Sequence, residues 1–215
     1  MRENDMHETA RQSLAILRQP EHFNWSFAVF LSFAIYVYVV EIERRNWNIV
    51  LGALALYGLE WFIEMINGFV FHFTEFSPIW TTTGNTIFQI LPGLTFEISI
   101  MFAVSGVVFL KLLPPDKNMK ILGINNRKFL WFANAIFMVA LECIVNAWGH
   151  LPWNYSWWNF PNVWLIVLLG YVPYMMLAFY VHDHPSMKRK LQIVVGIAIV
   201  DVILFSVFAV GLGWM

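Results

Sequence analysis

The sequence predicts an all-α protein, a polytopic bundle of about six transmembrane helices. Of its 215 residues, 59% are hydrophobic and only 13% are charged, whereas soluble domains carry about 25% charged residues. The mean hydropathy is +0.61. Aromatic residues make up 18% of the chain and 11 residues are Trp, which is typical of proteins whose rings lie at lipid interfaces.

Six apolar stretches are long enough to cross a hydrocarbon core, which takes about 20 helical residues. We place them near residues 24–41, 48–72, 85–111, 129–150, 160–182 and 190–213. Together they form one six-span domain over residues 23–215. Pro92-Gly93 interrupts the third stretch, where proline followed by glycine predicts a kink or a break.

Residues 1–22 form an N-terminal polar or interfacial segment that lacks the apolar core of a signal peptide. Within it, residues 5–19 predict a short helix on the membrane surface, ended by Pro20. The apolar face of this helix is thin, so a solvated tail is the alternative.

The basic residues divide unevenly between the two sides of the bundle. Three lie on the side of the N-terminus, namely Arg2, Arg11 and Arg18. Ten lie on the other side: Arg44, Arg45, Lys111, Lys117, Lys120, Arg127, Lys128, Lys188, Arg189 and Lys190. By the positive-inside rule this second side is cytoplasmic, so we expect both termini outside.

Several function classes receive no support from the sequence. A net charge of −1 and the lack of a basic patch on a soluble domain argue against a nucleic-acid partner. Cys143 is the single cysteine, so no intramolecular disulfide is expected. The chain contains no P-loop and no G-x-G-x-x-G, G-x-S-x-G or C-x-x-C motif.

Carboxylates lie near the middle of four apolar stretches: Glu60, Glu97, Glu142 and Asp201. An ionised group at that depth costs at least ~2.5 kcal/mol on insertion scales, so it indicates a functional site by default. Glu60, Glu142 and Asp201 follow their basic anchor residues at similar distances, and Glu97 reaches the same depth from the other side. The sequence therefore predicts that the four acids share one level of the bundle.

Helical spacing predicts that these acids face one another. Glu60, Glu64 and Asn67 stand at i, i+4 and i+7, which is one face of a helix. Two more polar stripes have similar spacing, one made of Asn134, Glu142, Asn146 and His150 and the other of Gln89, Gly93 and Glu97. Polar stripes directed at lipid would lack partners, so we expect them to line one cavity.

We assign roles within this cavity by residue type. Glu60, Glu142 and Asp201 are the expected acids or bases, with Glu64 and Glu97 tuning them. The expected substrate-binding residues are Asn67, Asn146 and His150 from the stripes and Trp153, Tyr155 and Trp157 from an aromatic loop. Loops 72–85 and 149–162 carry no Lys or Arg, and the second is expected to cap the cavity.

The chemistry that fits this set is acid–base catalysis on a lipid-soluble substrate. Neighbouring carboxylates in a dry site cannot all ionise, so some act as acids while another acts as a base. Aromatic walls would stabilise a passing carbocation. The combination suits protonation, cyclisation, hydration or isomerisation of an isoprenoid or other lipid. The alternative without chemistry is a set of interhelical hydrogen bonds that fix the packing.

Two short stretches resemble the small integral-membrane terpene cyclases. These enzymes pair an acid beside an aromatic residue in an early span with an Asp in the last span, and the matching stretches here are Leu59-Glu60-Trp61-Phe62 and Val200-Asp201. The resemblance implies a catalytic role for Glu60 and Asp201. The Asn-x-x-Trp-Glu run of that family is absent, and Glu60-Trp61 has the reverse order.

Three other interpretations stay open. His72 and His150 with the carboxylates form a weak metal-site candidate, because no span contains a Glu-x-x-His pair; we expect no metal or other cofactor. A proton- or cation-coupled carrier is the second, and a chain this small would work as a homodimer. The third is a non-catalytic subunit of a membrane complex. In each case the expected partners are membrane lipids and a lipid-soluble small molecule, not nucleic acid.

Overall fold

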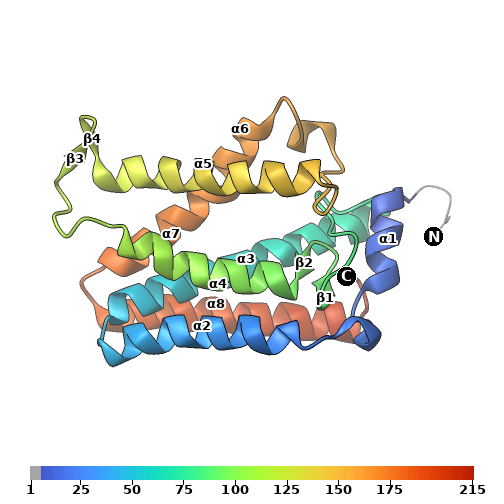
Figure 1. The fold of residues 1–215 in the computed structure, drawn as a ribbon, viewed down its shortest axis with the longest axis horizontal. Coiled ribbons are helices and arrows are strands. Elements are labelled where there is room, and N and C mark those ends of the chain that lie inside the picture. The colour runs from blue at the N-terminus through green and yellow to red at the C-terminus, as the bar shows by residue number, and fades with distance from the viewer. Residues whose placement is uncertain (1–5) are drawn as a thin grey trace.

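Six helical segments run back and forth between two ends of the molecule in the computed structural model, which describes residues 6–215 (Figure 1). They are α2 (Ser26–Glu43), α3 (Trp47–Thr74), α4 (Phe96–Lys111), α5 (Asn126–Ala147), α6–η3–α7 (Val163–Leu165, Ile166–Tyr171 and Val172–Asp183) and α8–η4 (Met187–Leu204 and Phe205–Gly211). All except α4 are long and apolar enough to cross a membrane. The all-α bundle is therefore confirmed.

The connections between these segments gather at two ends with different composition. We call one the basic end, formed by residues 44–46, 112–125 and 184–186, and it includes the hairpin of β3 (Lys120–Ile121) and β4 (Ile124–Asn125). The other is the aromatic end, formed by residues 75–95 and 148–162, with the short helix η2 (Ser156–Trp158). The ten basic residues grouped in the sequence lie at or next to the basic end.

The third predicted span is shorter than expected. Pro92-Gly93 forms the turn of a hairpin between β1 (Gln89–Leu91) and β2 (Leu94–Thr95), and the helix α4 begins only at Phe96. The Thr95 side chain caps α4 by accepting a hydrogen bond from the Ile98 amide. Proline disfavours helix in the residue before it and lacks an amide donor, so the interruption is a break and not a kink. The predicted helical stripe of Gln89, Gly93 and Glu97 is therefore wrong.

The N-terminal segment packs against the aromatic end. Its helix α1 (Glu8–Ile16) is followed by the short helix η1 (Pro20–His22). Ser13 is buried and donates a 2.8 Å hydrogen bond to the Pro92 carbonyl of the hairpin. Arg18 donates to the Met215 carbonyl at 2.8 Å. The predicted helix is present, and its contacts are with the loops of the bundle and with the C-terminus.

The helix α3 is the centre of the bundle and packs against α2, α4, α7 and α8. Small residues allow its close approach to α4, since a Cβ added at Gly106 would lie 3.0 Å from Ala53 Cα. By contrast, α5 packs mainly against η3 and α7. This arrangement leaves room between α5 and the α3–α4 pair at the level of the predicted site.

The α6–η3–α7 segment contains a π-helical stretch, η3, at this level. Pro173 is the second residue after η3, and its nitrogen cannot donate to the carbonyl one turn earlier. The wider hydrogen-bond pattern of a π-helix, from residue i to i+5, accommodates this missing hydrogen bond. π-helical turns are frequent at functional sites. Its effect here is to direct Ile166, Gly170 and Tyr171 toward the interior.

Candidate functional site

A cavity of about 260 Å³ lies between α3, α4, α5, η3 and α7, under the loops of the aromatic end. We call it the acid cavity, because its lining contains Glu60, Glu64 and Glu142. All its other lining residues are apolar, aromatic or uncharged. The structure thus brings together three of the five acids predicted for the site.

The Glu60 carboxylate lies on the α7 side of the cavity. It is 4% exposed and accepts a 2.6 Å hydrogen bond from the Tyr174 hydroxyl. Tyr174 in turn packs against Phe102 and Tyr171, with ring centroids 5.6 and 5.8 Å apart. This aromatic packing holds the tyrosine, and the tyrosine orients Glu60.

The Glu64 carboxylate lies one helical turn further toward the aromatic end and is only 2% exposed. It accepts a 2.8 Å hydrogen bond from Trp80 Nε1. Asn67 ties the loop to α3, since its amide oxygen accepts from the Ile79 backbone amide at 2.7 Å and its amide nitrogen donates to the Trp80 carbonyl at 2.9 Å. The loop 75–95 is therefore fixed by the same polar stripe that lines the cavity.

The hairpin turn touches this stripe directly. A Cβ added at Gly93 would lie 2.5 Å from Asn67 Nδ2, 2.6 Å from Glu64 Oε2 and 2.7 Å from Trp80 Nε1. Only glycine fits so close to three polar atoms that already bond to one another. Gly93 therefore closes the aromatic end of the cavity.

The Glu142 carboxylate enters from α5, on the opposite wall. One oxygen accepts a 2.9 Å hydrogen bond from Trp153 Nε1. The other, Oε2, is buried and accepts no well-formed hydrogen bond in the described part of the chain, and the Tyr171 hydroxyl lies near this carboxylate. Trp158 Nε1, also on the cavity wall, is a buried donor with no partner among residues 6–215. An acceptor and a donor beside the cavity are thus buried without a partner in the described residues.

The wall between α5 and the neighbouring helices is open to the outside of the bundle. Several apolar lining residues are also exposed, including Met101 on α4 at 38%, Leu141 on α5 at 38% and Leu169 on η3 at 63%. In a bilayer this opening would face acyl chains. An apolar molecule could then enter sideways without crossing an aqueous phase.

Two predicted acids lie elsewhere. Glu97 accepts hydrogen bonds of 2.6 Å from Thr86 Oγ1 and from the Ile87 amide, so it holds the loop before the hairpin. Asp201 lies on α8, and its Oδ2 would be 3.4 Å from a Cβ added at Gly58. Gly58 and Glu60 are two residues apart, about 200° around the helix. The structure therefore places Asp201 on the face of α3 away from the acid cavity.

The predicted substrate-binding residues also separate. Asn67 lines the cavity. Trp153 does not line it but donates a hydrogen bond to Glu142, which does. Asn146 donates to the Leu151 carbonyl at 2.8 Å, and Tyr155 donates to the Ser77 carbonyl at 2.9 Å, so both hold loops. His150 and Trp157 are exposed at the aromatic end and do not line the cavity.

Tyr171, Tyr174 and Trp80 carried no assigned role in the sequence, and Gly93 was placed there only in the helical stripe that the structure contradicts. Tyr171 and Tyr174 lie one turn apart around Pro173 within an apolar span, and that spacing is the signal that could have identified them. In the sequence, Trp80 is explained equally well as an aromatic ring at the membrane interface, and Gly93 as a turn residue. Only the folded loop shows that they contact Glu64.

In residues 6–215 no group of three or more His, Cys, Asp or Glu side chains is arranged to hold a metal ion. The two histidines of the metal hypothesis lie outside the acid cavity. His72 stacks on Trp214 with ring centroids 4.1 Å apart, and the His150 backbone bonds the opposite loop through Thr83.

Comparison with known proteins places the chain in a family. The profile of a family described as an uncharacterized membrane protein family matches residues 7–210. A protein of Archaeoglobus fulgidus, described as an uncharacterized protein, is 40% identical over 208 residues, which cover 97% of this chain and 99% of its own length. No solved structure matches the chain. Neither match supports the resemblance to terpene cyclases. The chain belongs to this uncharacterized membrane protein family.

Proposed function

We propose that the protein is an integral membrane enzyme that uses the acid cavity for acid–base chemistry on a lipid or isoprenoid substrate. The observation that carries this proposal is the arrangement of three carboxylates, two of them buried (Glu60 and Glu64) and one half-buried (Glu142), in an otherwise uncharged cavity that opens sideways from the bundle. Buried acids without cationic partners cost stability, so they are retained for a task.

Each carboxylate is positioned by its own donor, namely Tyr174, Trp80 or Trp153. A fixed position is what proton transfer requires, because a general acid or base works only within hydrogen-bond reach of the reacting atom. Glu142 Oε2 is the buried carboxylate oxygen of the lining that accepts no well-formed hydrogen bond in residues 6–215, so a bond to a substrate would satisfy it. We therefore assign the first proton transfer to Glu142.

The simplest reaction for this site is a double-bond shift. A protonated Glu142 gives its proton to one carbon of a C=C bond, forming a C–H bond and a carbocation. The ionised member of the Glu60–Glu64 pair then removes a proton from a neighbouring carbon, and the double bond forms there. Atoms and charge balance without a co-reactant. The rings of Phe102, Trp158 and Tyr171 on the wall would stabilise the cation.

Deuterium incorporation tests this proposal. The purified protein is incubated in D2O with lipids extracted from its membrane, and mass spectrometry then measures deuterium in non-exchangeable C–H positions. We expect incorporation into one lipid class and a loss of at least ~100-fold in Glu142→Gln, the usual size of a general acid–base contribution. Glu75→Gln, at an exposed position of the aromatic end, is the matched control.

Two outcomes would contradict the proposed enzymatic function. Incorporation that Glu142→Gln leaves unchanged would place the chemistry elsewhere. No incorporation, combined with proton-gradient-dependent uptake in proteoliposomes, would favour a carrier.

We also propose that the basic end faces the cytoplasm, on the positive-inside rule. Labelling of single cysteines introduced at Lys120 and Glu75 from each side of sealed vesicles would test this orientation.

A further inference from the structure

We propose that the basic end contains a second binding site, a pocket for a phosphate group. The pocket has a volume of about 570 Å³ and lies among the ends of α2, α3, α4, α5, α7 and α8. We call it the basic pocket. It is separate from the acid cavity, with which it shares no lining residue.

The charge of this pocket is unbalanced. Its lining contains five cationic side chains, Arg44, Lys111, Lys117, Arg127 and Lys190, and two carboxylates, Glu41 and Asp183. The described lining therefore has an excess of three positive charges with the histidines neutral. An anion of charge −1 or −2 would lower the repulsion among them.

Two of the cations are already paired with the two carboxylates. Lys111 Nζ lies 2.5 Å from Glu41 Oε1. Arg127 binds Asp183 with both ends of its guanidinium, at 2.8 Å from Nε to Oδ2 and 3.2 Å from Nη2 to Oδ1. These pairs hold α2 to α4 and α5 to α7. They form the frame of the pocket.

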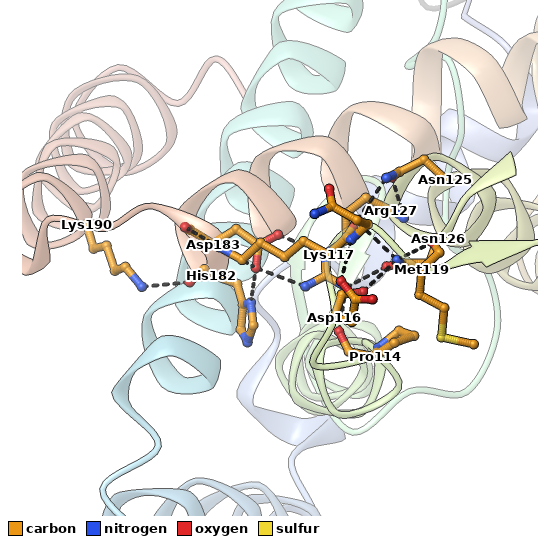
Figure 2. Close-up of polar contacts among 11 residues, drawn as sticks. Pro114, Asp116, Lys117, Met119, Asn125, Asn126, Arg127, His182, Asp183 and Lys190 are labelled. Carbon is orange, nitrogen blue, oxygen red and sulfur yellow. Dashed lines mark hydrogen bonds and ion pairs between the residues drawn. The ribbon is translucent and has the colours of Figure 1, made fainter.

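The other three cations are not neutralised in this way. Lys190 is 3% exposed and donates to neutral oxygens, the Asn48 side-chain carbonyl and, at 2.6 Å, the His182 backbone carbonyl. Lys117 donates to the Asp183 backbone carbonyl at 3.0 Å and lies 3.7 Å from a carboxylate that Arg127 already occupies. Figure 2 shows Lys117, Arg127 and Lys190 converging on the His182–Asp183 corner from separate elements.

Arg44 completes this set. It lies exposed on the pocket wall at the end of α2, where its charge acts on Glu41, a carboxylate that Lys111 already pairs. The N-terminus of α3 lies beside it, and its N-cap Asn46 makes no side-chain cap hydrogen bond. Helix N-termini carry partial positive charge and free amide donors, which favour phosphate.

Phosphate fits these groups better than a carboxylate does. Lysine binds phosphate as a point charge, and arginine binds it through its fork of donors. Basic pockets between transmembrane helices bind the head groups of anionic lipids, and this pocket lies where the helices of the bundle end. A soluble phosphate compound offers the same chemistry. The experiment therefore has one arm for each source.

The test uses the full chain in a neutral detergent and measures the melting temperature. One arm adds inorganic phosphate against chloride at equal ionic strength. The other adds phosphatidylglycerol to the micelles against phosphatidylcholine. We expect a rise in melting temperature in at least one arm, and the arm that responds identifies the source.

Variants locate the effect. Arg44→Gln/Lys117→Gln should weaken the apparent affinity by at least ~10-fold, because two charge-assisted contacts are lost. Lys128→Gln/Lys188→Gln removes the same charge from exposed positions outside the pocket and should bind as the native chain does. Arg44→Gln alone is the variant that should disturb folding least, because Arg44 is exposed and its interaction with Glu41 is a charge–charge attraction.

The proposal is overturned if neither phosphate nor phosphatidylglycerol raises the melting temperature above its control. It is also overturned if both double variants lose affinity equally, since that result would mean attraction to the whole basic end. Loss confined to Arg44→Gln/Lys117→Gln supports it.

Discussion

At the aromatic end, three carboxylates share a cavity whose described lining contains no lysine or arginine, whereas both carboxylates of the basic pocket contact a lysine or an arginine. The partners of the first set are a tyrosine and two tryptophans. Paired charges hold elements together. When one partner is removed, the other stays behind as an unpaired charge whose desolvation is no longer compensated, and stability falls. Unpaired acids give up stability in exchange for reactivity.

The comparison predicts that the basic end is the more sensitive to loss of a charge. Arg127→Gln leaves Asp183 without its bidentate partner and removes the bond to the Pro114 carbonyl, 2.8 Å away. We expect the free energy of unfolding to fall by about 3 kcal/mol, measured by denaturant unfolding in detergent. Lys128→Gln, at the next and exposed position, should change it by less than about 0.5 kcal/mol. Equal losses of stability in Arg127→Gln and Lys128→Gln would mean that the paired charge contributes no more to stability than the exposed one.

At the aromatic end, packing should matter more than charge. Gly93→Ala places a methyl group within 2.7 Å of three polar atoms, so it should lower the free energy of unfolding by about 2 kcal/mol. Gly196→Ala is the control, because nothing lies within 4 Å of its added Cβ and alanine favours the helix. Matching melting curves for Gly93→Ala and the native chain would mean that the hairpin is not held against Glu64.

The acids themselves should behave in the opposite way to Arg127. Glu142→Gln keeps an oxygen to accept from Trp153 and removes a buried charge. We expect a free energy of unfolding within about 1 kcal/mol of the native value, or above it, while deuterium incorporation is lost. A large loss of stability would instead make Glu142 a structural residue.

A small and local effect is expected at the attachment of α1. Ser13→Ala removes the hydrogen bond to the Pro92 carbonyl and the one that Ser13 Oγ accepts from Gln89 Nε2, and should cost about 1 kcal/mol. Hydrogen exchange of residues 8–16 should rise before that of α3. Gln12→Ala removes only an exposed hydrogen bond to Glu8 within α1 and no contact with the bundle, so it should leave the exchange unchanged. If residues 8–16 exchange equally fast in Ser13→Ala and Gln12→Ala, α1 is not held through the Ser13 side chain.

Much of the fold was predictable because the apolar stretches are long and the basic residues fall between them. The helix α3 agrees closely with its predicted span, and Glu60, Glu64 and Asn67 share a face as their spacing requires. Glu142 joins them because α5 presents it at the same level. The break at Pro92-Gly93 was predictable as a break or kink, but the hairpin was not, since it depends on pairing between Gln89 and Thr95.

The sequence by itself determined the membrane class, the order of the helices, the basic and aromatic ends, and the helix faces on which Glu60, Glu64 and Glu142 lie. Tertiary structure decided which faces meet. Asp201 and Glu60 have the same predicted depth, yet α8 packs on the opposite side of α3 from the acid cavity. Periodicity fixes a side chain relative to its own helix axis, whereas the neighbouring helix is chosen by packing, such as the small residues Gly106 and Ala53. Residues at the same depth form one site only where packing brings their helix faces together.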